Sequence, residues 1–574
     1  MIRTGYFSKK RARILYLLIL GFITVQFRLV YIQFYKHDHY KAQAIKQSTS
    51  TTRIPAERGR VLDRNGKVIA ESYLSKSLWS DPKLITDEEK LVTFLKKASK
   101  ILNKPYSELE EICRKKRRFV WLSRFLKYKQ VEELEVIVKK TPGIYLKEEW
   151  SRFYRSGESM SPVVGLVGAE HQGLTGLEQR YNKILSGKDG KSSQVRNAKR
   201  QVLKEEIIEE PVAGSDVSLT LDIGIQTILY NELKVAYEKF KPETASGMVV
   251  DVNTGQILGM ATLPAHVPGN PIQKGLIGLK PKMVVDIFEP GSTMKPLIYA
   301  EILEKGLGRS DEVVDCGLSG SRLFGRRRIS EFRNHSYGKI TLEQVIIKSS
   351  NIGTAFMADR LGNKNIHKLV KGLGFGEKNY LPFSGEPRGL LAPLKNWTSY
   401  STHSIPMGHE IGVTMTQMLR AYVALGNGGY VMQPSLELKV TDCYGKIVRK
   451  GGSLPVGRIF SPATCQKTLK ALEQVVQVGT ARRCQSDLYS IGGKTGTTEK
   501  LINGRYAKNN KNIGSFVGLA PIEKPRIAIM IAMDSATVGS YTTGGVVSAP
   551  AAKRVIENVL QYLGVPTKKA GDDV

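Results

Sequence analysis

A serine and a lysine stand three residues apart in the run Phe-Glu-Pro-Gly-Ser-Thr-Met-Lys-Pro, which spans residues 288–296. Apolar residues follow at helical spacing, so Ser292 and Lys295 are predicted to share one face at the start of a helix. The free N–H groups and the positive dipole end of a helix start stabilise an alkoxide. A lysine with a lowered pKa can remove the serine proton, so the pair predicts a nucleophile and its general base. Alone, such a pair is typical of two solvated surface side chains.

Two further short motifs change that interpretation. Ser349, Ser350 and Asn351 follow an apolar run over residues 342–347, and Lys494-Thr-Gly-Thr497 begins a strand-like stretch. The order S-x-x-K, S-x-N, K-T-G, with gaps of 57 and 145 residues, resembles the penicillin-recognising serine transferases. Each motif is common by chance, but the three together in this order are highly specific.

Other stretches extend the resemblance along the chain. They are R-G-R-V-L-D-R-N-G at 58–66, G-L-T-G-L-E at 173–178, G-V-T-M-T-Q at 412–417, G-T-A at 479–481 and S-F-V-G at 515–518. The chain as a whole resembles the class B penicillin-binding proteins, which are membrane-anchored peptidoglycan D,D-transpeptidases. Its second motif is more similar to that of division-type members, which implies work at the septum. An elongation-type transpeptidase, a penicillin sensor and a β-lactamase-like protein remain the alternatives.

The resemblance implies a role for each motif residue. Ser292 would attack the carbonyl between two D-alanines of a stem peptide, with neutral Lys295 as general base. Ser349 would bridge the two lysines and pass the proton to the leaving amine. Asn351 would hold the substrate amide and position Lys295, because an amide offers both a donor and an acceptor. Lys494 would supply positive charge near Ser349 and the substrate carboxylate.

The third motif is also expected to bind substrate. Thr495 and Thr497 offer hydroxyls to the substrate carboxylate, and Gly496 lets the substrate approach the strand closely. The backbone N–H groups of Ser292 and Thr497 would form the oxyanion hole. The family chemistry uses no metal and no organic cofactor. Its implied ligands are peptidoglycan stem peptides and, as inhibitors, β-lactams.

A class A β-lactamase carries the base that activates water on a loop between the second and third motifs, and three glutamates of this chain are candidates there. Glu377, Glu386 and Glu410 have no E-x-x-L-N setting, so each is expected to be a solvated loop carboxylate. This favours a transpeptidase, whose acyl-enzyme waits for an amine.

Charge and cysteine content restrict the remaining choices. The 574 residues include 86 basic and 53 acidic side chains, a formal charge of +33, which suggests an anionic partner. No motif has the spacing of a nucleic-acid-binding element, so nucleic acid is not expected. The five cysteines at 113, 316, 443, 465 and 484 form no C-x-x-C pair, which argues against a zinc site. A disulfide among the last three is an open alternative.

The N-terminal residues have the pattern of a membrane-spanning segment. Basic residues between 3 and 13 precede an apolar run from Ile14 to about Ile32, which Gln26 and Arg28 interrupt. About 20 such residues span a bilayer. The basic flank predicts an N-terminus in the cytoplasm, and no small-residue cleavage site follows, so the run is expected to be an uncleaved single-pass anchor in the cytoplasmic (inner) membrane. The catalytic part would then lie outside.

The predicted fold is multidomain α+β, with the transmembrane helix, an elongated pedestal domain and a transpeptidase domain whose antiparallel sheet is covered by helices. The domain boundaries are expected at 1–13 for the tail, 14–34 for the anchor, 35–215 for the pedestal, 216–566 for the transpeptidase and 567–574 for a disordered tail. Within them we expect a turn at Asn65-Gly66, helices across 86–140, a linker or hairpin over 186–216 and strands at 490–497, 512–519 and 526–533. No second catalytic domain is recognisable, so a polytopic glycosyltransferase and division proteins are implied as partners.

Overall fold

The computed structural model describes residues 4–197, 202–268, 278–502, 505–507, 511–538 and 542–568. The chain forms two compact units. The smaller unit consists of Met1–Glu57 and Gly187–Ala213, and the larger unit consists of Arg58–Ser186 and Gly214–Val574. Of the disordered tail expected over 567–574, residues 569–574 lie outside the described part. The predicted domain boundaries stay predictions.

The smaller unit begins with the apolar helix that the sequence predicted. Helix α1 (Thr4–Val30) continues through a π-helical turn, η1 (Tyr31–Tyr35), and the segment Lys9–Tyr35 is long and apolar enough to cross a membrane. Helix α2 (His37–Ser48) leads into a three-stranded antiparallel sheet of order β1-β6-β7, formed by Thr49–Ile54, Gly190–Arg196 and Val202–Glu209. The last two strands are the hairpin predicted over 186–216.

A seven-stranded sheet forms the first part of the larger unit. Six strands follow the order β19-β18-β8-β2-β3-β4, and the seventh, β5, also pairs with β3. Their bounds are Ile447–Lys450 (β19), Glu437–Thr441 (β18), Asp216–Leu219 (β8), Val61–Leu62 (β2), Val68–Ser80 (β3), Val120–Ser123 (β4) and Ile144–Tyr154 (β5). The predicted turn joins β2 to β3, with Gly66 at φ +80°. Strand β2 runs parallel to β8, a pairing between short segments far apart in the chain.

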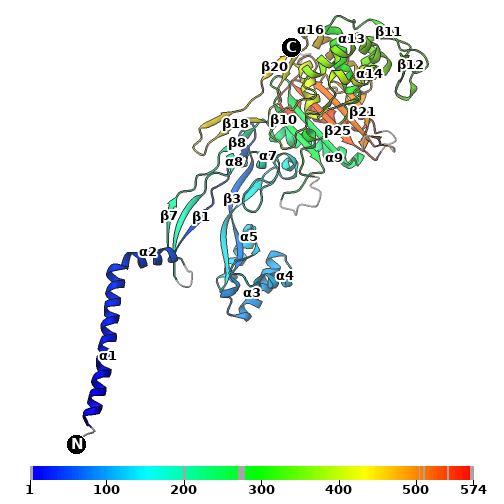
Figure 1. Ribbon diagram of the computed structural model, residues 1–574. Helices are drawn as coiled ribbons and strands as arrows, with labels where there is room; N and C mark the ends of the chain where they lie inside the picture. Colours follow the sequence, from blue (N-terminus) through cyan, green and yellow to red (C-terminus); the bar gives the residue numbers. More distant parts are fainter. Residues whose placement is uncertain are drawn as a thin grey trace. The chain divides into compact units, whose positions relative to one another are not determined.

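Three helices pack at the far end of β3 (Figure 1): α3 (Glu88–Leu102), α4 (Tyr106–Cys113) and α5 (Tyr128–Val138). Their apolar faces meet Leu78, Leu122 and Ile144 of the sheet in one buried cluster. The prediction of helices across 86–140 is therefore correct except at β4, whose residues pair with β3 as a strand and place Leu122 in this cluster.

A buried charge cluster joins the segment before β2 and strand β5 to helix α7 (Gly176–Arg180). Glu178 is fully buried and accepts hydrogen bonds from Nε of Arg58 and Nε of Arg152, each at 2.7 Å. Arg58 also donates to the side chain of Asn182 at 2.8 Å. These contacts explain the two non-catalytic motifs that begin at residues 58 and 173. The first motif supplies a buried arginine, and the second supplies the buried glutamate that pairs with it.

The second part of the larger unit is built on a five-stranded sheet that is antiparallel throughout. The strand order is β10-β9-β25-β24-β21. The strands are Ile257–Leu263 (β10), Thr244–Asp251 (β9), Ile527–Asp534 (β25), Asn512–Ala520 (β24) and Gly492–Glu499 (β21). Helices α9 (Ile223–Phe240) and α18 (Ala549–Tyr562) pack together on it, and α15 (Met415–Gly426) contacts β9, β24 and β25. This confirms the predicted fold class, including the three C-terminal strands. All five cysteines are free thiols, and four are buried.

Candidate active site

Ser292 lies on a tight turn that leads into a helix. The turn is the 3₁₀ segment η4 (Gly291–Met294), and α11 (Lys295–Glu304) follows directly, with Pro296 in its first turn. Gly291 has φ +56°, and a Cβ on it would lie 2.6 Å from Cγ2 of Thr498, so the turn presses against β21 at a place that only glycine fits. Tyr422 also holds the turn in place, because its hydroxyl donates a hydrogen bond to the Thr293 carbonyl oxygen at 2.9 Å.

Lys295 is fully buried and reaches away from its own helix. Its Nζ donates to the carbonyl of Ser349 at 2.6 Å, to Oδ1 of Asn351 at 2.7 Å and to Oγ of Ser349 at 3.4 Å. Burial lowers the pKa of Lys295 to about 8, although the nearby carboxylate of Glu331 opposes that change. No hydrogen bond among the described residues joins Lys295 to Ser292, a contact that tightens in many enzymes only when substrate binds.

Ser349 stands between the two lysines. It follows helix α12 (Leu342–Lys348) and occupies the left-handed backbone region at φ +62°. Lys494, also fully buried, donates from Nζ to Oγ of Ser349 at 2.9 Å. Burial and the neighbouring charge of Lys295 hold the pKa of Lys494 well below its usual range. The hydroxyl therefore connects two amines whose protons are unusually easy to remove.

Glu331 organises the second motif, and sequence reasoning missed it. It is 4% exposed and accepts hydrogen bonds from the Ser350 hydroxyl, from the backbone N–H of Asn351 at 2.7 Å and from that of Ile352 at 3.1 Å. These N–H groups begin helix α13 (Asn351–Gly372), where a carboxylate is favoured by the dipole. Asn351 donates from Nδ2 to the Ser330 carbonyl at 2.8 Å, so both ends of its amide are fixed. No spacing signal marks Glu331, because its contacts are tertiary.

The third motif lies on β21, which is the edge strand of the five-stranded sheet beside the Ser292 turn. A Cβ on Gly496 would lie 3.0 Å from the Pro290 carbonyl, so the strand and the turn are in close approach. Thr497 accepts a hydrogen bond from the N–H of Gly544 at 3.2 Å through its hydroxyl, and the Thr495 hydroxyl lies 2.8 Å from that of Thr480. An edge strand has backbone groups that can pair with an extended peptide. The structure thus places all eight predicted site residues on three neighbouring segments.

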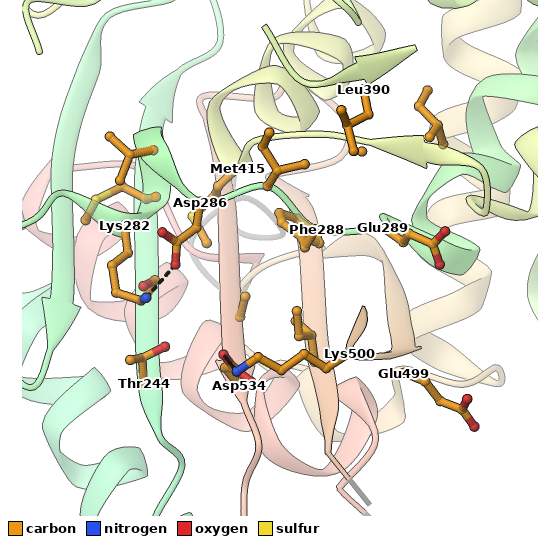
Figure 2. A pocket seen from close by; sticks show the side chains of 18 of the residues that line it. Thr244, Lys282, Asp286, Phe288, Glu289, Leu390, Met415, Glu499, Lys500 and Asp534 are labelled. Atoms are coloured by element: carbon orange, nitrogen blue, oxygen red, sulfur yellow. Dashed lines mark hydrogen bonds and ion pairs between the residues drawn. The ribbon is translucent and has the colours of Figure 1, made fainter. Parts of the chain in front are cut away.

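A cavity of about 660 Å³ lies beside this site (Figure 2). Its walls include Phe288 and Glu289, just before the Ser292 turn, and Glu499 and Lys500 at the end of β21. Ion pairs Lys282–Asp286 and Lys500–Asp534, at 2.5 Å and 2.7 Å, balance part of its charge. None of the predicted site residues lines it.

The three candidate glutamates do not contact the predicted site residues through any described hydrogen bond. Glu377 pairs with Lys371 at 3.0 Å and Glu410 accepts from Ser401 at 2.8 Å, and both are exposed, as expected. For Glu386 the expectation of a solvated carboxylate is wrong. It is 5% exposed because it accepts the backbone N–H groups of Asn379 and Leu381 and thereby closes a loop. Among the described residues, no three His, Cys, Asp or Glu side chains form a group that could hold a metal ion.

Comparison with known protein families gives two matches along the chain. Residues 245–557 match the penicillin-binding protein transpeptidase domain, and residues 53–219 match the penicillin-binding protein dimerisation domain. The chain is 30% identical to a probable peptidoglycan D,D-transpeptidase, PenA, of Neisseria meningitidis, over 94% of this chain and 90% of that protein. It is also 30% identical to stage V sporulation protein D of Bacillus subtilis, over 97% and 87%. Identity to the peptidoglycan D,D-transpeptidase FtsI of Escherichia coli is 28%, over 94% and 89%.

Solved structures share the fold. Penicillin-binding protein 2X of Streptococcus thermophilus aligns with a TM-score of 0.75 at 22% identity, over 90% of this chain and 81% of that one. Penicillin-binding protein 3 of Mycobacterium tuberculosis in complex with aztreonam aligns with a TM-score of 0.70 at 24% identity, over 90% and 98%.

Proposed function

The chain belongs to the class B penicillin-binding proteins, the peptidoglycan D,D-transpeptidases, and from this we propose that it cross-links stem peptides by acyl transfer through Ser292. The observation that carries the proposal is the shared hydroxyl of Ser349, which Lys295 and Lys494 both contact within hydrogen-bond distance. Such a chain of groups can carry a proton from the nucleophile to a leaving amine.

In the acylation step, neutral Lys295 takes the proton from Oγ of Ser292 as that oxygen attacks the carbonyl between two D-alanines. The negative charge that develops on the carbonyl oxygen is met by the backbone N–H groups of Ser292 and Thr497. The C–N bond then breaks, and Ser349 passes the proton from Lys295 to the departing D-alanine. Asn351 holds the substrate amide, while Lys494 with the hydroxyls of Thr495 and Thr497 receives the terminal carboxylate.

In the second step, the amine of a neighbouring stem peptide attacks the Ser292 ester and forms the cross-link. The solved relative from M. tuberculosis binds aztreonam and ampicillin, and we extend that behaviour to this chain. A β-lactam would acylate Ser292 with its leaving nitrogen still tethered, so that nitrogen blocks the incoming amine and the adduct persists. The exposed or loop-bound positions of Glu377, Glu386 and Glu410 favour this outcome over β-lactamase turnover.

Penicillin labelling tests the nucleophile. The purified full chain, incubated with labelled penicillin, should gain one adduct that peptide mapping places at Ser292. The Ser292→Ala variant should gain none, while Ser319→Ala, an exposed loop serine, should label normally. An adduct that remains in the Ser292→Ala variant would show that another serine is the nucleophile.

We assign the cross-linking to the septum, with wall elongation as the alternative. Similarity to FtsI and the neutral residue after Ser349 support the septal role. A fluorescent fusion should gather at the division site. Uniform distribution along the lateral wall would favour the elongation role.

The anchor is proposed to leave the N-terminus in the cytoplasm and the catalytic part outside the cytoplasmic membrane. Support comes from the basic flank before the apolar run of α1. A reporter that is active only after export, fused after Val574, should be active. Activity of a cytoplasm-specific reporter at that position would reverse the topology.

The same helix is proposed to contact a polytopic glycan-polymerising partner. Gln26 and Arg28 are polar groups within an apolar segment, and Arg28 lies 5.5 Å from the ring centroid of Tyr31. Polar side chains in a membrane are expensive unless they are paired, which favours a helix–helix contact. Replacement of α1 by an unrelated spanning helix should abolish co-purification with the polymerase; co-purification that survives the exchange would contradict this partner surface.

A further inference from the structure

At the end of β3, helices α3, α4 and α5 pack on one face of the sheet, and aromatic side chains lie on the other face. Along β3, Leu78 points toward α3, α4 and α5, whereas its neighbour Trp79 lies on the opposite face. Trp79 is directly opposite Trp121 on β4 and Tyr145 on β5, so the three side chains share that face. The face therefore carries a row of aromatic rings across three strands.

The rings contact one another and form a fixed surface. Trp79 stacks with Phe119 and with Tyr145, in both pairs with ring centroids 4.8 Å apart, and Phe119 meets Trp121 edge-on at 4.8 Å. We call Trp79, Phe119, Trp121 and Tyr145 the aromatic platform. Phe119 is 42% exposed and Tyr145 36% exposed, although both are large apolar groups. A contiguous exposed aromatic surface of this kind marks a binding site more often than a scattered apolar residue does.

Basic side chains lie beside the platform, of which Arg124 is also paired with Glu149 and Glu170, each at 2.8 Å. The guanidinium of Arg124 lies 4.8 Å from the Trp121 ring centroid, and the ammonium of Lys147 lies 5.9 Å from it. The basic run over residues 114–118 ends directly before Phe119. Arg114 and Lys115 pair with glutamates of α3 and α4, whereas Lys116, Arg117 and Arg118 are exposed and have no ion pair among the described residues. The unpaired cations fit an anionic ligand.

We propose that the aromatic platform and Lys116, Arg117 and Arg118 hold a peptidoglycan glycan strand at a second site, separate from the one that contains Ser292. The proposal rests on the proposed function, since that function makes this polymer the substrate. Sugar rings present apolar C–H faces that pack on aromatic rings, and stem peptides present carboxylates that pair with lysine and arginine. Both chemistries occur along one polymer, and in this chain the basic run over 114–118 adjoins Phe119 of the platform.

An anionic membrane surface is the less favoured occupant. Membrane-binding aromatics insert individually into the headgroup region. Here Trp79 is stacked between Phe119 and Tyr145, and Trp121 has cations above its ring, so the rings form a sheet-bound surface rather than separate protruding groups. A site that holds the strand would raise the effective concentration of stem peptides without changing the chemical step.

Co-sedimentation with insoluble peptidoglycan tests the site. The full chain in phosphatidylcholine nanodiscs is first acylated with penicillin, so that Ser292 is blocked. Trp121→Ala and the double variant Arg117→Glu/Arg118→Glu should each bind at least about tenfold more weakly than the parent, since loss of a central contact in an interface costs on the order of one decade in affinity. The double variant Lys467→Glu/Lys470→Glu makes the same charge change on the exposed side of α16 (Pro462–Gln477) and should bind normally.

Penicillin labelling separates the possible failures. Normal labelling of every variant shows an intact fold, and absence of labelling in the parent would contradict the proposed function rather than the second site. Unchanged sedimentation of both platform variants, or equal loss in the α16 control, would overturn the glycan site. Platform-dependent binding to phosphatidylglycerol vesicles, without binding to peptidoglycan, would replace it with a membrane contact.

Discussion

Oγ of Ser349 lies 2.9 Å from Nζ of Lys494, although Ser349 itself occupies the left-handed backbone region at φ +62°. This conformation costs a residue with a side chain about 1–2 kcal/mol, and glycine would adopt it freely. Strain of this kind persists where the surrounding structure enforces it, often at functional sites. Here it directs the hydroxyl toward both lysines at the junction between α12 and α13.

Substitution of Ser349 should therefore separate stability from chemistry. Ser349→Gly relieves the backbone strain and should unfold at a higher temperature than Ser349→Ala, which keeps it. Both variants lack the bridging hydroxyl and should be acylated by penicillin more slowly than the parent, by roughly 10²-fold or more. Thermal unfolding and stopped-flow acylation measure the two effects. Near-normal acylation of Ser349→Gly would show that the hydroxyl carries no proton.

The pH dependence of acylation should report Lys295. Its pKa is lowered to about 8, and only the neutral amine can accept the serine proton. The acylation rate should consequently rise with pH up to about 8 and level off above it. Lys295→Arg keeps the positive charge but cannot lose its proton, so it should be inactive at every pH. A flat profile in the parent, or activity in the arginine variant, would point to a different base.

Glu331, which lies outside the three motifs, should affect the pH dependence of the acylation rate. The carboxylate of Glu331 raises the pKa of Lys295 against the larger effect of burial, whereas burial and the charge of Lys295 lower the pKa of the neighbouring Lys494. Glu331→Gln removes that charge, so the midpoint of the acylation profile should move to lower pH. The plateau should also fall, because the amide presents a donor to the N–H of Asn351. Glu377→Gln, on an exposed loop, is the control; an unshifted midpoint in Glu331→Gln would separate Glu331 from Lys295.

The buried charge cluster should dominate the stability of the region that holds β3. Glu178→Ala leaves the guanidinium groups of Arg58 and Arg152 buried without their carboxylate, which should cost about 3–5 kcal/mol. Differential scanning calorimetry should show a lower unfolding temperature. The same change at Asp311, in an exposed ion pair with Arg309, should leave the unfolding temperature unchanged. Equal behaviour of the two variants would contradict a structural role for Glu178.

The sequence predicted the elements that carry a periodic or motif signal. Ser292, Ser349 and Lys494 were identified because each short motif begins or ends an element with a clear apolar pattern. The strands β24 and β25 were predicted for the same reason. The sequence could not predict features that depend on contacts between segments far apart in the chain.

Glu331 and β4 illustrate that limit. Glu331 contacts the start of α13 from a segment 20 residues earlier, and no local pattern encodes that distance. Val120 and Leu122 lie in a stretch with helical spacing on both sides, and only pairing with β3 makes them a strand. The aromatic platform likewise joins Trp79 to Trp121, which no sequence periodicity connects.

The formation of a cross-link tests the central claim most directly. The full chain is incubated with a donor peptide that ends in D-Ala-D-Ala and with a second peptide that offers a free amine, and the products are analysed by mass spectrometry. The account predicts a peptide dimer with release of one D-alanine per dimer from the parent protein and no dimer from Ser292→Ala. A dimer formed equally by Ser292→Ala, or a parent protein that yields only hydrolysed donor whatever the amine concentration, would contradict transpeptidation through Ser292.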